Sequence, residues 1–130
     1  MSRALFEALL EEARRSLPNE CCGLLGGHGR EVTRIFPATN ALASPVAYEI
    51  PSRELFDLFR RLRAERLELA GIYHSHPAGE NAPSAHDAER AYYSEVAYVI
   101  LSPRPAHPRP LRAFHLAAGS IEELAVEVVG

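Results

Sequence analysis

The strongest structural signal in the chain is the run LAGIYHSHP at residues 69–77. Its apolar and aromatic residues predict a strand, and Pro77 ends that strand because proline cannot continue an interior ladder. Side chains two positions apart on a strand point to one face, about 6.5 to 7 Å apart along the chain. His74 and His76 can therefore approach a single ion from the same side of a sheet.

Ser84 and Asp87 follow this strand after a short loop bounded by prolines. The pair matches a variant of the capping box, which predicts a helix from Ser84 through about Tyr93. Asp87, in the first turn, can return across the loop to the same ion. Two imidazoles and one carboxylate suit Zn²⁺, and three protein ligands leave a fourth tetrahedral position open, as in catalytic sites. The alternative is an exposed His-x-His pair beside residues that only cap a helix.

The rest of the chain alternates helices and strands without a strict βαβ rhythm. Apolar residues at helical spacing predict a helix between the Ser2 cap and Pro18 and a second helix from Pro51 through residue 62. Strands are predicted over residues 21–27, 32–36, 69–76, 96–101, 111–116 and 121–129, with 48–50 as a further short candidate. The first two strands should form a hairpin. These elements predict an α/β (α+β) fold, a mixed β-sheet flanked by helices in one domain over residues 1–130.

Composition excludes several classes of function. The 130 residues carry 17 acidic and 14 basic side chains, for a net charge of −3, which disfavours binding to nucleic acid. All the basic residues are arginines, so Schiff-base chemistry and a P-loop lysine are unavailable. No apolar run is long enough to span a membrane, and the N-terminus lacks the apolar region of a signal peptide. We therefore expect a cytoplasmic protein that binds neither membrane nor nucleic acid.

An open zinc site that hydrolyses amides also needs a base for the attacking water. Glu20 stands out because it directly precedes the apolar segment CCGLLGG, where partial burial would raise its pKa toward the working range. Its alternative role is that of a solvated residue in a loop. Periodicity alone does not choose among the several candidate glutamates, which include Glu20, Glu31, Glu49, Glu80 and Glu95.

Taken together, these residues resemble the signature of the JAMM metalloproteases, also called the MPN-plus or JAB family, E…H-x-H-P-x6-S-x2-D. The resemblance extends over nearly the whole chain and includes Asn40 and the sequence YEIP at residues 48–51. It implies a single JAMM/MPN-plus metalloprotease domain over residues 1–130, of the small prokaryotic type, with a fold similar to that of cytidine deaminases.

The resemblance also implies roles for individual residues. His74, His76 and Asp87 would hold Zn²⁺, Glu20 would act as the base toward the zinc-bound water, and Ser84 would donate a hydrogen bond to the oxyanion. The implied activity is hydrolysis, as a peptidase or isopeptidase, of the amide bond after the C-terminal Gly-Gly of a ubiquitin-like or sulfur-carrier protein. Because all five residues are present, we expect an active enzyme. The loop over residues 77–83 is too short for the insertions of the polyubiquitin-specific members.

Two other interpretations have to be weighed. A zinc nucleobase deaminase would need H-x-E followed by P-C-x-x-C, and the chain has only the adjacent Cys21 and Cys22. Neighbouring residues on a strand face opposite ways, so at least one of these cysteines should pack in the core. A non-catalytic MPN-type module that binds ubiquitin-like proteins stays open as the alternative function. A homodimer stays possible, and no role is assigned to His28, His86, His107 or His115.

Overall fold

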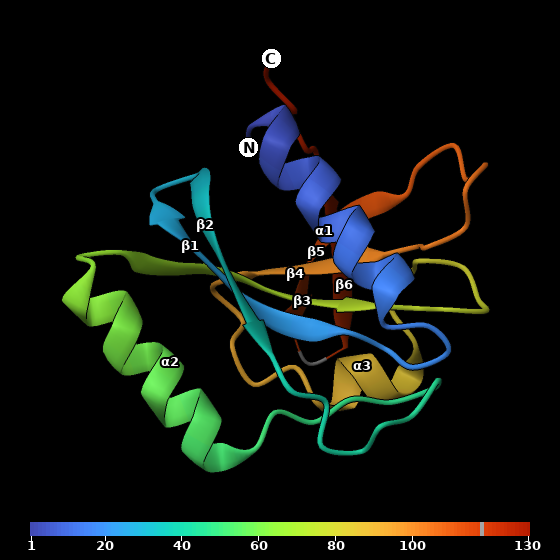
Figure 1. Ribbon diagram of the computed structural model, residues 1–130, viewed down its shortest axis with the longest axis horizontal. Helices are drawn as coiled ribbons and strands as arrows, with labels where there is room; N and C mark the ends of the chain where they lie inside the picture. The colour runs from blue at the N-terminus through green and yellow to red at the C-terminus, as the bar shows by residue number, and fades with distance from the viewer. Residues whose placement is uncertain (118) are drawn as a thin grey trace.

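The computed structural model describes residues 1–117 and 119–130, which form one mixed sheet and three helices (Figure 1). The strand order is β2-β1-β3-β4-β5-β6, and every neighbouring pair is antiparallel except β3 with β4. The predicted class, a mixed β-sheet flanked by helices, is confirmed. In chain order the elements are α1 (Arg3–Arg15), β1 (Cys22–His28), β2 (Glu31–Ala38), α2 (Ser52–Ala64), β3 (Glu68–Ser75), α3 (Ala85–Glu89), β4 (Ala97–Leu101), β5 (Leu111–Ala117) and β6 (Ser120–Leu124).

The two long helices cover opposite faces of the sheet, as strand alternation requires. Leu25 and Tyr73 pack with the buried side of α1, whereas their neighbours Leu24 and Ile72 pack with α2. Ser2 caps α1 by accepting a hydrogen bond from the Leu5 backbone N–H at 3.2 Å. Figure 1 shows α1 in front of the sheet, whereas α2 lies at the lower left, away from the two chain ends. The result is two apolar layers that hold the central strands in place.

The pairing of β1 with β3 sets the position of the predicted site. Cys22 lies opposite His74 in this antiparallel register. The connection from β3 to its parallel neighbour β4 contains α3, so that helix returns to the end of β3 where the chain leaves the sheet. In sheets with parallel strands, ligands bind outside such carboxyl ends.

Most predicted boundaries differ from the observed ones by a residue or two, and some elements differ in ways that have a visible cause. Residues 48–50 form no strand, because the Glu49 N–H donates to Asn40 Oδ1 at 3.2 Å and not to a ladder. The short helix ends at Glu89 and not near Tyr93, whose N–H donates to the Tyr98 hydroxyl at 3.0 Å. β2 runs through Pro37 to Ala38, which an edge strand permits.

The largest difference concerns the last strand. β6 covers Ser120–Leu124, and the prediction that it continues to residue 129 is wrong. The chain leaves the sheet after Leu124 and returns to its own start, where Val129 bridges to Ser2 and its carbonyl accepts from the Arg3 N–H at 2.9 Å. The two termini therefore lie side by side, as Figure 1 shows.

Both cysteines are buried, and they form no disulfide bond. Cys21 packs in the layer under α1, while the Cys22 thiol faces the Thr39 carbonyl at 3.6 Å. Burial raises the pKa of both thiols to about 12, so neither is a ready thiolate at neutral pH. Core packing is therefore the role of both.

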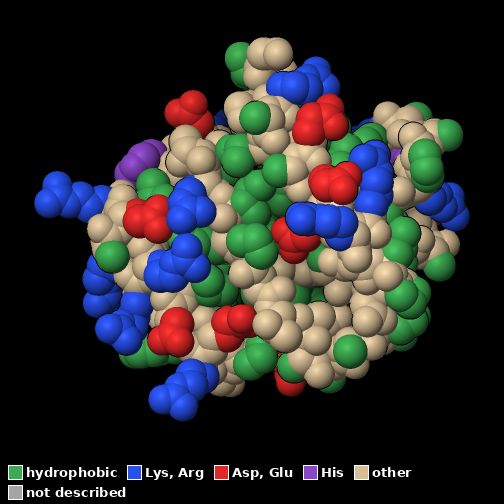
Figure 2. Space-filling model, in the orientation of Figure 1, with side chains coloured by type: hydrophobic (Ala, Val, Ile, Leu, Met, Phe, Trp, Pro, Cys, Tyr) green, Lys and Arg blue, Asp and Glu red, His purple; other side chains and the backbone are tan. Residues whose placement is uncertain are grey.

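Acidic and basic side chains are interspersed on the face of the molecule that carries α1, as Figure 2 shows. Neither sign of charge gathers into a stripe on that face. Among the described residues, no helix has both the length and the apolar character that a membrane crossing requires.

Candidate metal centre

Three predicted ligands meet where β3 ends. His74 lies on β3, His76 follows its last residue, and Asp87 reaches back from α3. His74 Nε2 lies 3.1 Å from Asp87 Oδ1, and His76 Nε2 lies 3.0 Å from Asp87 Oδ2. The two Nε2 atoms are 3.1 Å apart. Within the described part of the chain, this is the one group of three or more His, Cys, Asp or Glu side chains placed to hold a metal ion.

The donor set fits a tetrahedral cation. Ligands at zinc-like bond lengths stand about 3.3 Å from one another at the corners of a tetrahedron, close to the separations of these nitrogen and oxygen atoms. Although burial opposes the carboxylate form, hydrogen bonds from His74 and His76 hold the pKa of Asp87 well below its usual range. A negative charge therefore persists beside two imidazole nitrogens, which is an environment that attracts a divalent cation.

His74 is held by packing. Its side chain is 1% exposed, and its ring stacks on that of Tyr48 with centroids 4.7 Å apart and an interplanar angle of 23°. Burial lowers its pKa, which favours the neutral imidazole that a metal requires. Its Nδ1 atom has no hydrogen-bond partner among the described residues. The stack with Tyr48 is therefore the contact that sets the ring plane.

His76 is held by hydrogen bonds. Its backbone N–H donates to the Leu101 carbonyl at 2.9 Å, and its Nδ1 lies 2.8 Å from the Glu80 carbonyl oxygen. Because a carbonyl only accepts, this contact places the proton on Nδ1 and directs Nε2 toward Asp87. Burial opposes the charged form, but the hydrogen bonds to Asp87 and to the Glu80 carbonyl outweigh it and raise the pKa of His76.

Ser84 and Asp87 form the predicted capping box. The Asp87 N–H donates to Ser84 Oγ at 3.0 Å, and the Ser84 N–H donates to Asp87 Oδ2 at 2.9 Å. The cap orients the carboxylate toward the histidines, so capping and ligation are compatible in one residue. Ser84 is exposed, and its hydroxyl keeps a proton that it can donate.

Glu20 lies beside the three candidate ligands, two positions before the start of β1. The Ser75 N–H donates to the Cys21 carbonyl at 3.1 Å, and the Cys21 N–H donates to Ser75 Oγ at 2.9 Å. Glu20 directly precedes Cys21, and its carboxyl is close enough to His76 and Asp87 for their charges to act on its pKa. Its side chain is 5% exposed, and Oε1 has no hydrogen-bond partner among the described residues.

The environment of Glu20 raises its pKa to about 7. Burial is the main cause, the nearby His76 lowers the value, and the nearby Asp87 raises it. The predicted rise in pKa from burial therefore agrees with the structure, and the solvated-loop alternative does not. The other candidate glutamates, Glu31, Glu49, Glu80 and Glu95, are all exposed.

Three residues at the site make contacts that the sequence did not predict. Tyr48 stacks on His74, whereas the sequence placed it in a short strand and in the stretch that resembles the family, with no role at the site. Asn40 ties Glu20 to the following loop, since its side-chain N–H groups donate to the Glu20 carbonyl at 3.2 Å and the Ala47 carbonyl at 3.0 Å. Asn81 is fully buried in the loop between His76 and Ser84. For Asn40 and Asn81, the available signal was an amide side chain within a short turn-rich segment.

None of the described histidines without an assigned role belongs to the group of His74, His76 and Asp87. His28 and His86 are exposed. His107 packs against the Glu80 carboxylate at 3.6 Å, and His115 lies 3.5 Å from the Glu122 carboxylate.

Comparison with known proteins places the chain in one family. The family model described as prokaryotic homologs of the JAB domain matches residues 2–117. The CysO-cysteine peptidase of Mycobacterium tuberculosis is 36% identical over 127 residues, which are 96% of this chain and 87% of that protein. A probable TtuB-protein conjugate cleaving protease of Thermus thermophilus is 39% identical over 126 residues, 93% of this chain and 79% of that protein.

Solved structures show the same fold. The protein DSY2949 of Desulfitobacterium hafniense superposes with a TM-score of 0.84 and 31% identity, covering 98% of this chain and 90% of that one. AF2198 of Archaeoglobus fulgidus, a JAB1/MPN domain protein, superposes with a TM-score of 0.68 and 22% identity, covering 99% of this chain and 97% of that one. The mixed sheet with its flanking helices is therefore the JAB/MPN fold.

Proposed function

The chain belongs to the family of prokaryotic homologs of the JAB domain, and on that basis we propose that it is a zinc-dependent peptidase or isopeptidase. Its proposed substrate is a ubiquitin-like or sulfur-carrier protein, cleaved at the amide bond after the C-terminal Gly-Gly. The observation that carries this proposal is the meeting of His74, His76 and Asp87 at the end of β3, next to the buried carboxylate of Glu20.

In this proposal, His74, His76 and Asp87 hold the metal through Nε2, Nε2 and the carboxylate. Bound there, zinc would supply Lewis-acid chemistry, polarising the scissile carbonyl and making water acidic enough to attack at neutral pH. Nitrogen and oxygen donors also accept other divalent ions, so the choice of zinc rests on the three-ligand pattern with an open fourth position.

Glu20 moves the proton. As a carboxylate it takes a proton from the attacking water, and as a carboxylic acid it passes that proton to the leaving amine nitrogen when the C–N bond breaks. A pKa of about 7 suits both steps, because each form is then accessible near neutral pH. The unpartnered Oε1 atom is a suitable acceptor, since no described residue competes for it.

Ser84 stabilises the developing charge on the carbonyl oxygen in this proposal. Its Oγ atom accepts from the Asp87 N–H, which fixes the hydroxyl at the mouth of the site. The remaining O–H donor is then directed away from the helix and can bond an oxyanion. Removal of one such donor commonly lowers kcat by about 100-fold to 1,000-fold.

The substrate class is supported by an apolar groove beside the ligands. It is lined by Leu24, Tyr48, Ile50, Leu55, Ile72, Tyr92, Tyr93 and Tyr98, with Glu49 and Arg90 paired at 3.1 Å on its rim. Tyr48 forms one wall and also stacks on His74, so a peptide that lies in the groove continues to the metal ligands. A Gly-Gly end carries no side chains, so its extended backbone can approach the backbone of the site closely.

The test uses a ubiquitin-like carrier that bears a short peptide after Gly-Gly. Zinc-loaded wild-type protein should release the peptide, whereas Glu20→Gln should keep the metal and lose about 100-fold to 10,000-fold in kcat. His76→Ala should lose both metal and turnover. Glu65→Gln, which removes a carboxylate paired with Arg34 on the far surface, serves as the matched control and should cleave normally.

The same assay separates the alternative function. A wild-type protein that contains zinc and binds the carrier, yet leaves the peptide intact, would be a non-catalytic binding module. Wild-type turnover by Glu20→Gln would remove Glu20 as the base. A cytoplasmic location belongs to the same proposal.

A further inference from the structure

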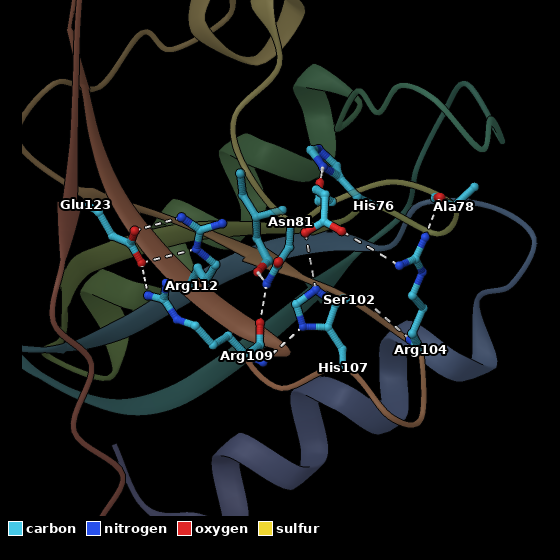
Figure 3. Close-up of polar contacts among 11 residues, drawn as sticks. His76, Ala78, Asn81, Ser102, Arg104, His107, Arg109, Arg112 and Glu123 are labelled. Carbon is cyan, nitrogen blue, oxygen red and sulfur yellow. Dashed lines mark hydrogen bonds and ion pairs between the residues drawn. The ribbon is translucent and has the colours of Figure 1, made fainter.

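Asn81 is a buried polar residue in the loop that joins the two halves of the metal centre. Its side chain is 0% exposed. The side-chain amide donates to the Arg109 carbonyl at 2.7 Å and, over a longer 3.4 Å, to the Ile100 carbonyl (Figure 3). Both partners only accept, so the amide nitrogen must face them.

The other end of this amide has no partner. Asn81 Oδ1 is buried and makes no hydrogen bond with any described residue. A buried acceptor without a donor costs folding free energy, which offsets part of what the two donated hydrogen bonds contribute. These two bonds tie the loop to β4 and to the β4–β5 connection, so they can serve a positioning purpose as well as stability.

The loop geometry indicates that purpose. The Glu80 carbonyl that accepts from His76 Nδ1 at 2.8 Å belongs to the peptide unit joining Glu80 to Asn81. A peptide unit is planar, so fixing the position of Asn81 also fixes the direction of this carbonyl. Figure 3 shows His76 and Asn81 on the same short stretch of chain, with Asn81 pointing to the β4–β5 connection.

We propose that Asn81 is a positioning residue for the metal ligand His76. By tying the loop to the Arg109 and Ile100 carbonyls, it aims the Glu80 carbonyl at His76 Nδ1 and so keeps Nε2 directed to the metal. The inference rests on the proposed metal site. It adds a residue outside the E…H-x-H-P-x6-S-x2-D pattern, at one of the unspecified x6 positions.

A second set of contacts on the same loop provides the comparison. The Glu80 carboxylate lies 3.8 Å from Arg104 and 3.6 Å from His107, and Arg104 also donates to the Ala78 carbonyl at 3.2 Å. The Glu80 side chain is 71% exposed, so solvent weakens these ion pairs. The buried amide of Asn81, rather than the exposed carboxylate of its neighbour, therefore holds the loop.

The experiment compares Asn81→Ala with Glu80→Ala. Glu80→Ala keeps the backbone carbonyl and removes only the exposed ion pairs, which makes it the matched control. Zinc affinity is measured by competition with a chromophoric chelator. Asn81→Ala should raise the zinc dissociation constant about 10-fold to 100-fold, the range seen when outer-shell partners are removed, and Glu80→Ala should change it less than about 3-fold.

A second readout separates positioning from general damage. Cobalt-loaded wild type and Glu80→Ala should share one visible d–d spectrum, whereas Asn81→Ala should show a changed spectrum because His76 is no longer held in one orientation. Asn81→Leu, which is similar in size but lacks the N–H donors, should behave like Asn81→Ala. Thermal unfolding of the metal-free variants should stay cooperative, with midpoints close to that of the wild type.

Several outcomes would overturn the proposal. They are an Asn81→Ala variant with wild-type zinc affinity and cobalt spectrum, equal losses in the Asn81 and Glu80 variants, and loss of cooperative unfolding with the spectrum unchanged. A wild-type protein that binds zinc but cleaves no substrate would overturn the proposed function alone. A wild-type protein that binds no zinc or cobalt would overturn both.

Discussion

The metal centre has two sides that are held in different ways. On the strand side, His74 lies on β3 opposite Cys22 of β1, and the buried Glu20 precedes β1 by two positions, in a sheet with an apolar layer on each face. On the loop side, residues 77–87 contribute Asp87 and the carbonyl partner of His76 through single polar contacts. A strand is supported along its whole length, whereas a loop depends on a few bonds. Changes on the strand side should therefore affect stability, and changes on the loop side should affect metal affinity.

The largest effect should come from the loop side, at Asp87. Asp87→Ala removes both a ligand and the acceptor of the capping box, so zinc affinity should fall by more than about 100-fold, beyond the range for outer-shell partners. Asp87→Asn keeps an oxygen that can accept from the Ser84 N–H, and α3 should survive in it. Equilibrium competition for zinc measures the first effect, and amide hydrogen exchange in α3 measures the second. Tight zinc binding by Asp87→Ala would remove Asp87 as a ligand.

The strand side should show a dependence of stability on pH through Glu20. Burial raises its pKa from 4.5 to about 7 in the folded, metal-free protein. Between these values the folded state binds more protons than the unfolded chain, so the stability of the wild type falls as pH rises through this window. Glu20→Gln cannot ionise, and the metal-free variant should exceed the wild type by up to about 3 kcal/mol above pH 7.

Urea unfolding at pH 4 and pH 8 measures this difference. At pH 4 the two proteins should be nearly equal, because Glu20 is then protonated in both states. Glu65→Gln, at an exposed ion pair, is the control. A gap between wild type and Glu20→Gln that stays constant with pH would contradict the burial argument.

The glycines of the two sides offer the next comparison. A Cβ atom at Gly23, on β1, would lie 2.5 Å from the Phe36 carbonyl oxygen and 2.5 Å from the Tyr73 hydroxyl oxygen. Gly23→Ala should therefore destabilise the fold by about 1–3 kcal/mol. At Gly79, in the loop, no described atom lies within 4 Å of such a Cβ, so Gly79→Ala should be neutral or slightly stabilising. Chemical denaturation of both variants tests the pair, and equal stability would show that the strand side is not the more tightly packed one.

The smallest effect should come from Tyr48, whose ring orients His74 by stacking. Tyr48→Leu removes the aromatic face and should weaken zinc binding about tenfold, at the low end for outer-shell changes. Tyr48→Phe keeps the stack and should bind zinc as the wild type does. If both variants bind alike, burial alone orients His74.

The sequence predicted most of the regular structure because local patterns control it. Helical spacing located α1 and α2, and the alternating runs located the hairpin of β1 and β2. The predicted element boundaries were wrong where a residue outside the predicted element pairs with the backbone. Beyond α3, the Tyr93 N–H donates to the Tyr98 hydroxyl. After β6, Val129 forms a bridge with Ser2, so the final residues do not extend that strand. Such contacts join residues that no local window contains.

The candidate site divides in the same way. The i, i+2 spacing of His74 and His76 and the capping pattern of Ser84 and Asp87 are local, and the sequence alone was sufficient to predict that these four residues could meet. Their assigned roles in catalysis and metal binding stay predictions. The choice of Glu20 over the other glutamates had no local signal beyond a neighbouring apolar run.

By itself, the sequence determined the chemistry available: two imidazoles at strand spacing, a carboxylate at a helix start, no lysine, and enough apolar residues for one layered domain. Only the tertiary structure decided which groups surround that chemistry. The pairing of β1 with β3 puts Cys22 opposite His74 and so brings the start of β1, next to Glu20, to this end of β3. The fold of residues 40–50 lays Tyr48 on His74, and the β4–β5 connection supplies the Arg109 carbonyl that accepts from Asn81. The physical reason is that spacing sets where side chains point, whereas burial and partners depend on segments far apart in the chain.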